Sequence, residues 1–145
     1  MEQASSSWVY LIAAASGWLI AQLLKYVFYA YKTKNFRDIS WLYQSGGMPS
    51  SHAAITVALA TIIGLKDGIE SGIFAVTVVL AAIVMYDAMQ VRRSSGEQGV
   101  ALKQLLEKAK ISHTPHHALG HTPLEVAAGA IVGFVISIVV AFFIT

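Results

Sequence analysis

The stretch Gly46-Gly47-Met48-Pro49-Ser50-Ser51-His52 lies between two apolar segments, and the rest of the chain is organised around it. Its glycines allow backbone conformations that other residues avoid, and its proline fixes φ just before an expected helix start. Ser50 or Ser51 can cap that helix, whose first N–H groups form a site for an anion. His52 then stands in the first turn, where it can exchange a proton or attack phosphorus. A helix cap with a surface histidine explains the stretch equally well, and a second constrained histidine, His121, favours the functional interpretation.

The composition is that of an integral membrane protein. Apolar residues make up 56% of the chain and charged residues 12%, with a mean hydropathy of +0.61. Soluble domains carry roughly 25% charged residues, and here long stretches hold no charge at all. The net charge of +2 is too small, and too confined to loops, to indicate a nucleic-acid partner. The absence of cysteine excludes a disulfide framework and thiolate metal sites.

The hydropathy pattern predicts a single membrane domain over residues 1–145, with about four transmembrane helices. The first apolar run is too long for the core of a secretory signal and lacks a basic flank, so we expect it to be retained. Residues 96–110 are expected to form an amphipathic helix on the membrane surface or under the bundle. The fold class is therefore all-α, with four spans and one or two interfacial helices. The expected spans cover residues 8–31, 50–65, 72–91 and 123–145, and a polar insert covers 92–122.

The basic residues predict an orientation. The loops after the first and third spans hold Lys32, Lys34, Arg37, Arg92, Arg93, Lys103, Lys108 and Lys110, whereas the opposite side holds Lys66. The positive-inside rule places these loops on the cytoplasmic side, or its equivalent in an organelle, and both termini on the other side. The polar groups in or next to the spans gather on the same side as the basic loops, which points to one site: Lys25, Ser50, His52, Asp87, Arg92, Arg93, His121 and Glu125.

Cations, serine hydroxyls and a helix N-terminus describe a pocket for a phosphate group. Two histidines can break a P–O bond, because one attacks phosphorus and the other protonates the leaving oxygen. Glu125 lies four residues after His121 and can hold that ring in the attacking tautomer. The segment Thr122-Pro123-Leu124-Glu125 is also a capping box, and this role alone explains the glutamate.

The other charged residues of this group can each be explained in two ways. Lys25 either snorkels to the headgroups or faces the polar site. Asp87 is either a buried partner of a cation or a functional acid. Arg92 and Arg93 either bind phosphate or simply flank a span. A histidine cluster is better explained by a loop or interfacial role than by a metal, because no carboxylate or cysteine lies at matching spacing: His113, His116 and His117.

These motifs resemble the type 2 phosphatidic acid phosphatase superfamily, which includes the vanadium haloperoxidases, and most closely its divergent membrane branch. The superfamily's Pro-Ser-Gly-His element corresponds to residues 49–52, with serine in place of glycine. Its final histidine and acid correspond to His121 and Glu125, with glutamate in place of aspartate. The signature of the divergent branch corresponds to Gly46 to His52, Asp87-Ala88, Val91-Arg92-Arg93 and Gly96-Glu97-Gln98.

The chain also departs from the superfamily pattern. No Arg-Pro follows Lys25, so Lys32 or Lys34 would have to replace it, and the arginine of the third element is far from His121. Four spans replace the usual six helices. The resemblance implies that His121 is the nucleophile, His52 the general acid and Glu125 the residue that orients His121. It further implies phosphate binding by Lys25, Ser50, Ser51 and Arg92 or Arg93, without a metal or other cofactor.

The sequence thus predicts a membrane-embedded lipid phosphate phosphatase. It would hydrolyse a phosphomonoester or pyrophosphate of a lipid through a phosphohistidine intermediate. The alternative is a non-catalytic membrane protein that binds anionic lipids, or scaffolds partners, with a degenerate phosphatase site. A small-anion transporter is disfavoured, because a transport pathway needs polar groups through the whole bilayer. The expected partners are a phosphorylated lipid and the bilayer, and small residues on the first and last spans favour a homodimer.

Overall fold

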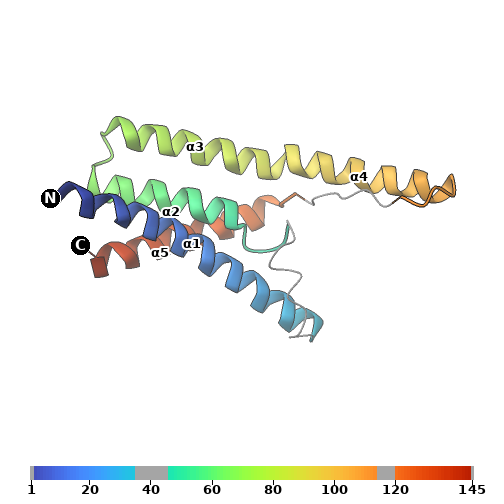
Figure 1. Ribbon diagram of the computed structural model, residues 1–145, viewed down its shortest axis with the longest axis horizontal. Helices are drawn as coiled ribbons and strands as arrows, with labels where there is room; N and C mark the ends of the chain where they lie inside the picture. Colours follow the sequence, from blue (N-terminus) through green and yellow to red (C-terminus); the bar gives the residue numbers. More distant parts are fainter. Residues whose placement is uncertain (1, 35–45, 114–119, 145) are drawn as a thin grey trace.

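A computed structural model describes residues 2–34, 46–113 and 120–144, and these residues form α-helices without a strand (Figure 1). Three helical stretches in them are long and apolar enough to cross a membrane, and α2 is a shorter apolar helix. The all-α membrane class expected from the hydropathy pattern is confirmed. Arg37, His116 and His117 lie outside the described residues. The helices are α1 (Glu2–Thr33), α2 (Ser51–Lys66), α3 (Gly72–Met89), α4 (Val91–Lys108) and α5 (Pro123–Ile144).

Serine caps fix the starts of two helices. Ser50 is the N-cap of α2, because its backbone is extended and its hydroxyl accepts a hydrogen bond from the Ala53 N–H at 3.4 Å. Ser71 caps α3 in the same way, with the Phe74 N–H at 3.2 Å. Of the two serines that could cap α2, the structure therefore uses the first, and Ser51 becomes the first helical residue.

Helix α2 lies at the centre of the bundle and packs against α1, α3 and α5. Its contact with α5 is close because glycines remove side chains from the interface. A methyl group at Gly129 would lie 2.2 Å from the Ser50 carbonyl oxygen, and one at Gly133 would lie 2.2 Å from that of Ala54. On the α1 side, a methyl group at Gly17 would lie 2.9 Å from the Ala58 Cβ. Small residues thus bring the backbones into contact, as in many membrane helix pairs.

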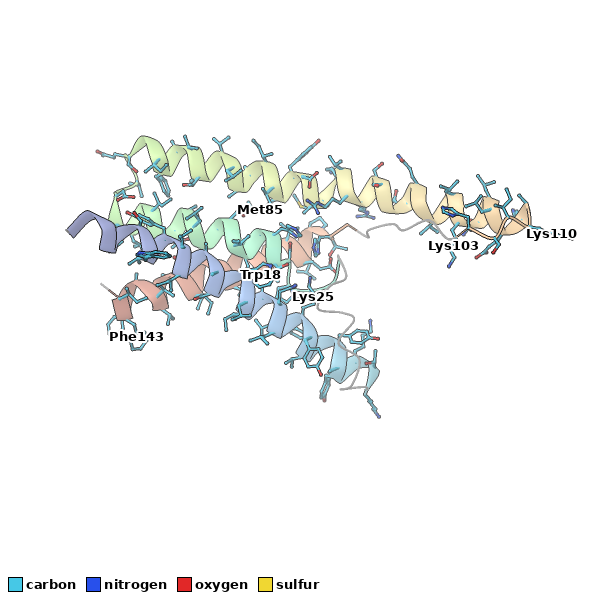
Figure 2. The ribbon with its side chains drawn as sticks, in the orientation of Figure 1. Trp18, Lys25, Met85, Lys103, Lys110 and Phe143 are labelled. Atoms are coloured by element: carbon cyan, nitrogen blue, oxygen red, sulfur yellow. The ribbon has the colours of Figure 1, made fainter. Side chains whose placement is uncertain are left out.

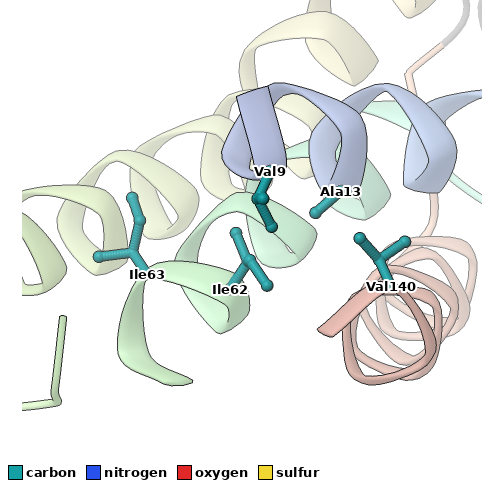
Figure 3. Packing of buried hydrophobic residues seen from close by; sticks show 5 residues of the cluster. All are labelled: Val9, Ala13, Ile62, Ile63 and Val140. Carbon is teal, nitrogen blue, oxygen red and sulfur yellow. The ribbon is translucent and has the colours of Figure 1, made fainter. Parts of the chain in front are cut away.

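An apolar core fills the end of the bundle that carries the two chain termini. Figure 3 shows Val9, Ala13, Ile62 and Val140 in the space between α1, α2 and α5, while Ile63 lies further out on α2; all five belong to one buried cluster. One polar contact crosses the interface further along, where the buried Ser137 hydroxyl donates to the Ala58 carbonyl at 2.9 Å.

Helix α4 begins at Val91, five residues before the start expected for the amphipathic helix. It continues almost in line with α3 and extends past the other helices (Figure 1). The intervening Gln90 keeps a right-handed helical backbone, and neither glycine nor proline stands at the junction to turn the chain. Among the described helices, α4 packs against α3 alone. The expectation that it packs under the bundle is therefore wrong for the described part of the chain.

Candidate active site

Most of the polar residues that the sequence singled out belong to segments that meet at the end of the bundle opposite the termini (Figure 1). The starts of α2 and α5, the end of α3 and the inner face of α1 converge there. Four of these side chains are buried, with at most 4% of their surface exposed: Lys25, Ser50, Ser51 and His121. Burying polar groups is costly unless they interact with one another or with a ligand.

Backbone hydrogen bonds hold the helix ends of the site together. The His121 N–H donates to the Ala88 carbonyl, and the Ser50 N–H donates to the Glu125 carbonyl, both at 2.9 Å. The first bond ties the entry of α5 to the end of α3, and the second ties α5 to the start of α2. At Gly120 the segment before α5 also comes very close to the backbone of α4, because a methyl group there would meet the Arg93 backbone nitrogen.

Glu125 serves as a helix cap and as the partner of His121 at the same time. Its Oε2 atom lies 3.0 Å from the Thr122 N–H nitrogen and 3.2 Å from Nδ1 of His121. The Glu125 N–H in turn donates to the Thr122 hydroxyl at 3.4 Å, which completes the capping box. The two roles that the sequence left as alternatives are therefore compatible. With the proton on Nδ1, Nε2 of His121 carries the free lone pair.

His52 approaches His121 from α2. The two ring centroids are 6.5 Å apart, with an angle of 61° between the ring planes. The Nδ1 atom of His52 is buried and has no hydrogen-bond partner among the described residues. Lys25, Asp87 and Arg92 also interact with the ring electrostatically. His52 is thus placed between charged groups with one nitrogen available for a further hydrogen bond.

Lys25 points from α1 toward the loop that leads into α2 (Figure 2). With 4% of its surface exposed it does not snorkel, and its side chain passes the backbone of Gly47. A cavity of about 740 Å³ opens beside it, and Glu125 and Met48 contribute to the wall. Besides Lys25, the α1 wall of this cavity consists of Phe28, Tyr29, Tyr31, Lys32 and Thr33.

The structure separates the two arginines. The Arg92 Nε atom lies 2.6 Å from the Asp87 carboxylate, so Asp87 is an ion-pair partner at the edge of the site. Arg93 points elsewhere, and its Nε lies 3.3 Å from the Glu97 carboxylate. Of the two, Arg92 is the one whose charge acts on His52. The pattern Arg-Arg could not distinguish them, because the helix that orients them begins at Val91 rather than five residues later.

His121 precedes α5 and lies outside the membrane-spanning helices. Burial lowers the pKa of His121 below its usual value, and the ammonium group of Lys25 lowers this pKa further. The Glu125 carboxylate and a hydrogen bond with the Gly47 backbone act in the opposite direction but do not compensate. The lowered pKa favours the neutral ring, which is the form that a nucleophile requires.

Some contacts of the site could not be predicted from the sequence. Ala88 and Gly47 lie in the motifs described above, but they act through their backbones, and residue type does not show which distant segment a backbone group contacts. Gly120 could have been noticed as a glycine beside a helix start, since such positions often allow close approach.

Among residues 2–34, 46–113 and 120–144, no three His, Cys, Asp or Glu side chains are grouped to bind a metal, and the His113 side chain is exposed.

The fold and the grouped side chains define an integral membrane helical bundle with a paired-histidine site at one end. Residues 7–136 match the family model described as the Divergent PAP2 family, and the chain belongs to this family. It is 33% identical to the protein named "Uncharacterized membrane protein YuiD" of Bacillus subtilis (strain 168), over 92% of this chain and 94% of the relative. No solved structure matches the chain. The resemblance drawn from the short motifs is therefore confirmed.

Proposed function

We propose that this protein is a metal-independent phosphatase that removes phosphate from a phosphorylated lipid. The observation that carries the proposal is the pairing of His121 with Glu125 opposite His52. The His52 imidazole comes from the first turn of α2 and the His121 imidazole from the segment that enters α5. Their centroids are 6.5 Å apart, so both rings can contact one phosphate ester bound beside them.

The reaction begins when Nε2 of His121 attacks phosphorus. An N–P bond forms as the P–O bond to the lipid breaks, and protonated His52 donates its proton to the leaving oxygen. Glu125 stabilises the positive charge on the phosphorylated ring. In the second step His52 takes a proton from water, the water oxygen attacks phosphorus, and the N–P bond breaks to release orthophosphate. Both histidines then regain their starting states.

The phosphate would be held by the groups around the histidines. Lys25 is buried beside the His121–Glu125 pair, where a dianionic phosphate would compensate its charge. The buried Ser50 and Ser51 stand at the start of α2, whose free N–H groups favour an anion. Arg92 reaches the site from α4, while Arg93 has no part in this pocket.

A lipid substrate fits the site better than a soluble one. The cavity beside Lys25 is walled by Phe28, Tyr29 and Met48, so an apolar chain can follow it while the phosphate remains near Lys25. The site also lies at one end of the spanning helices, where headgroups are found. Following the positive-inside rule, we propose that this end faces the cytoplasm or its organellar equivalent. A homodimer stays a prediction, and the small residues from which it was drawn pack against α2 within the bundle, as Gly17, Gly129 and Gly133 show.

The second candidate is a non-catalytic protein that binds anionic lipids. The observation that favours it is the Asp87–Arg92 pair at 2.6 Å, which neutralises the arginine that would otherwise contact phosphate. In this case His52 and His121 would only contribute hydrogen bonds to a headgroup.

The test is phosphate release in detergent with EDTA, from a panel of phospholipid and prenyl phosphates. Wild type is compared with His121→Ala, and His113→Ala serves as the control, since His113 is an exposed histidine beyond α4. We expect release by wild type and His113→Ala, inhibition by vanadate, and no release by His121→Ala. Absence of release from folded wild type would favour the lipid-binding candidate. Equal release by all three proteins would exclude His121 as the nucleophile.

A further inference from the structure

Two separate cavities border the His121–Glu125 pair. Glu125 lines the cavity of about 740 Å³ beside Lys25, whereas His121 lines a second cavity of about 390 Å³ on the α4 side. Aromatic residues of α1 form much of the first wall. The second cavity is bounded by α4 and the segment that enters α5: Arg93, Gly96, Glu97, Val100, Gly120, His121 and Thr122.

The second cavity carries a cation that the proposed catalytic pocket does not use. Arg93 and Glu97 stand one turn apart on α4, and their side chains are 55% and 71% exposed. Gly120 packs against the Arg93 backbone, which holds the base of this side chain next to the segment that carries His121. Arg93 and His121 thus line the same cavity, and the Arg93 side chain is largely open to solvent.

The two products of the proposed reaction need different exits. The dephosphorylated lipid stays in the bilayer, whereas orthophosphate is a dianion that must reach water. The aromatic side chains of the cavity beside Lys25 suit an apolar chain, and the solvent-exposed Arg93 of the second cavity suits an anion. A guanidinium is a good temporary partner for phosphate because it donates two parallel hydrogen bonds.

We propose that the Arg93 cavity is the port through which orthophosphate leaves and hydrolytic water enters, with Arg93 binding the departing phosphate. This inference rests on the phosphatase function proposed above. Glu97 competes with phosphate for the guanidinium, so the ion pair reforms when phosphate moves on to solution. The lipid alcohol leaves on the opposite side, past α1.

The experiment measures orthophosphate binding in two ways on detergent-solubilised full-length protein. One is the inhibition constant of added orthophosphate during lipid phosphate hydrolysis, and the other is equilibrium binding of ³²P-orthophosphate without turnover. Arg93→Ala should weaken both by about three- to fivefold, as expected for one partly exposed charge interaction. Glu97→Gln should strengthen both, because it frees the guanidinium. The control is Lys103→Ala, which removes a cation from an equivalent i,i+4 pair further along α4 and should change neither.

Opposite shifts in Arg93→Ala and Glu97→Gln would support the port. If both variants behave like Lys103→Ala while wild type releases phosphate, the port is excluded and the phosphatase function stands. If wild type releases no phosphate from any lipid, the proposed function fails, and the binding measurement still decides the site. Binding of ³²P-orthophosphate that depends on Arg93 would then support an anion site in this cavity, and binding that does not would overturn it.

Discussion

The two ends of the helical bundle are built differently. At the end that carries the termini, the interior consists of apolar side chains such as Ile62 and Val140. At the opposite end, the apolar cluster is small, comprising Ala53, Ala88 and Val126, and polar side chains are buried beside it. The helices there are joined by backbone hydrogen bonds between their ends rather than by interlocking side chains.

The two ends should therefore contribute differently: the apolar end to the stability of the fold, and the polar end to the proposed reaction. Lipid solvates apolar side chains well, so membrane helices associate mainly through close packing and hydrogen bonds. The terminal end supplies packing without ionisable groups in its core cluster, and the site end supplies positioned polar groups. Changes at the terminal end should therefore lower stability and leave the reaction intact, while polar changes at the site end should do the reverse. Four experiments can break or sharpen this division.

Glu125→Gln should have the largest effect. The amide still caps α5 but does not stabilise the charged His121 ring, so phosphate release should fall about 10²- to 10⁴-fold, the usual range for such catalytic groups. The thermal unfolding midpoint in detergent should change little, because the cap remains. If the unfolding midpoint falls strongly as well as the phosphate release, the site end also supports the fold.

Ile62→Ala should act in the opposite way. Ile62 is fully buried in the terminal core, so truncation should lower the free energy of unfolding by about 2–4 kcal/mol through lost packing. Denaturation in mixed micelles measures this loss, and release per folded molecule should remain at the wild-type level. Ile83→Ala is the matched control, since that side chain is 60% exposed on the outer surface of α3. Equal destabilisation by both would contradict the packing argument.

Gly129→Ala tests the boundary between the two ends. The added methyl group would meet the Ser50 carbonyl oxygen, so α5 must move away from α2 at a cost of about 1–3 kcal/mol. The same movement disturbs the Ser50–Glu125 backbone bond, and we expect stability and phosphate release to fall together. Gly72→Ala is the control, because no atom lies near its added methyl group. Loss of stability with unchanged release would show that the site tolerates this shift.

The smallest effect concerns pH. Because the pKa of His121 is lowered in the folded protein, the neutral nucleophile should persist as the pH falls through about 6.5, the value of a free histidine. The acid limb of kcat/KM should therefore lie below that pH. The unfolded chain binds this proton more readily, so the histidine should also reduce stability as the pH drops below the same value. An acid limb above pH 7 would contradict the neutral ring.

The sequence predicted the fold well because its signals were local. Charge-free runs marked the apolar helices, a serine marked the start of α2, and the Thr122–Glu125 spacing marked the start of α5. The same spacing brought Glu125 to His121, since residues four apart share a helix face. The short motifs were sufficient to identify the family.

The parts that could not be predicted depend on long-range geometry. Whether Lys25 turns inward depends on how α1 meets the loop before α2, and whether Arg92 or Arg93 faces His52 depends on where α4 begins. The Ala88–His121 bond joins backbones that are distant in the chain, and backbone partners are independent of side-chain type. The amphipathic pattern predicted the α4 helix but not that it continues almost in line with α3.

The alignment of α3 and α4 has a mechanical consequence. If α3 and α4 tilt together about the turn before α3, the displacement grows with distance from that turn. Over the 18 residues of α3, a tilt of about 5° displaces the far end by roughly 2 Å, comparable to the length of a hydrogen bond. Asp87, Arg92 and Arg93 lie at or just beyond that far end, so we expect the proposed site to respond to a change in the tilt of α3, which hydrophobic mismatch can alter. Phosphate release in vesicles of stepped acyl-chain length should pass through an optimum, and a flat response would show that α3 and α4 do not tilt together.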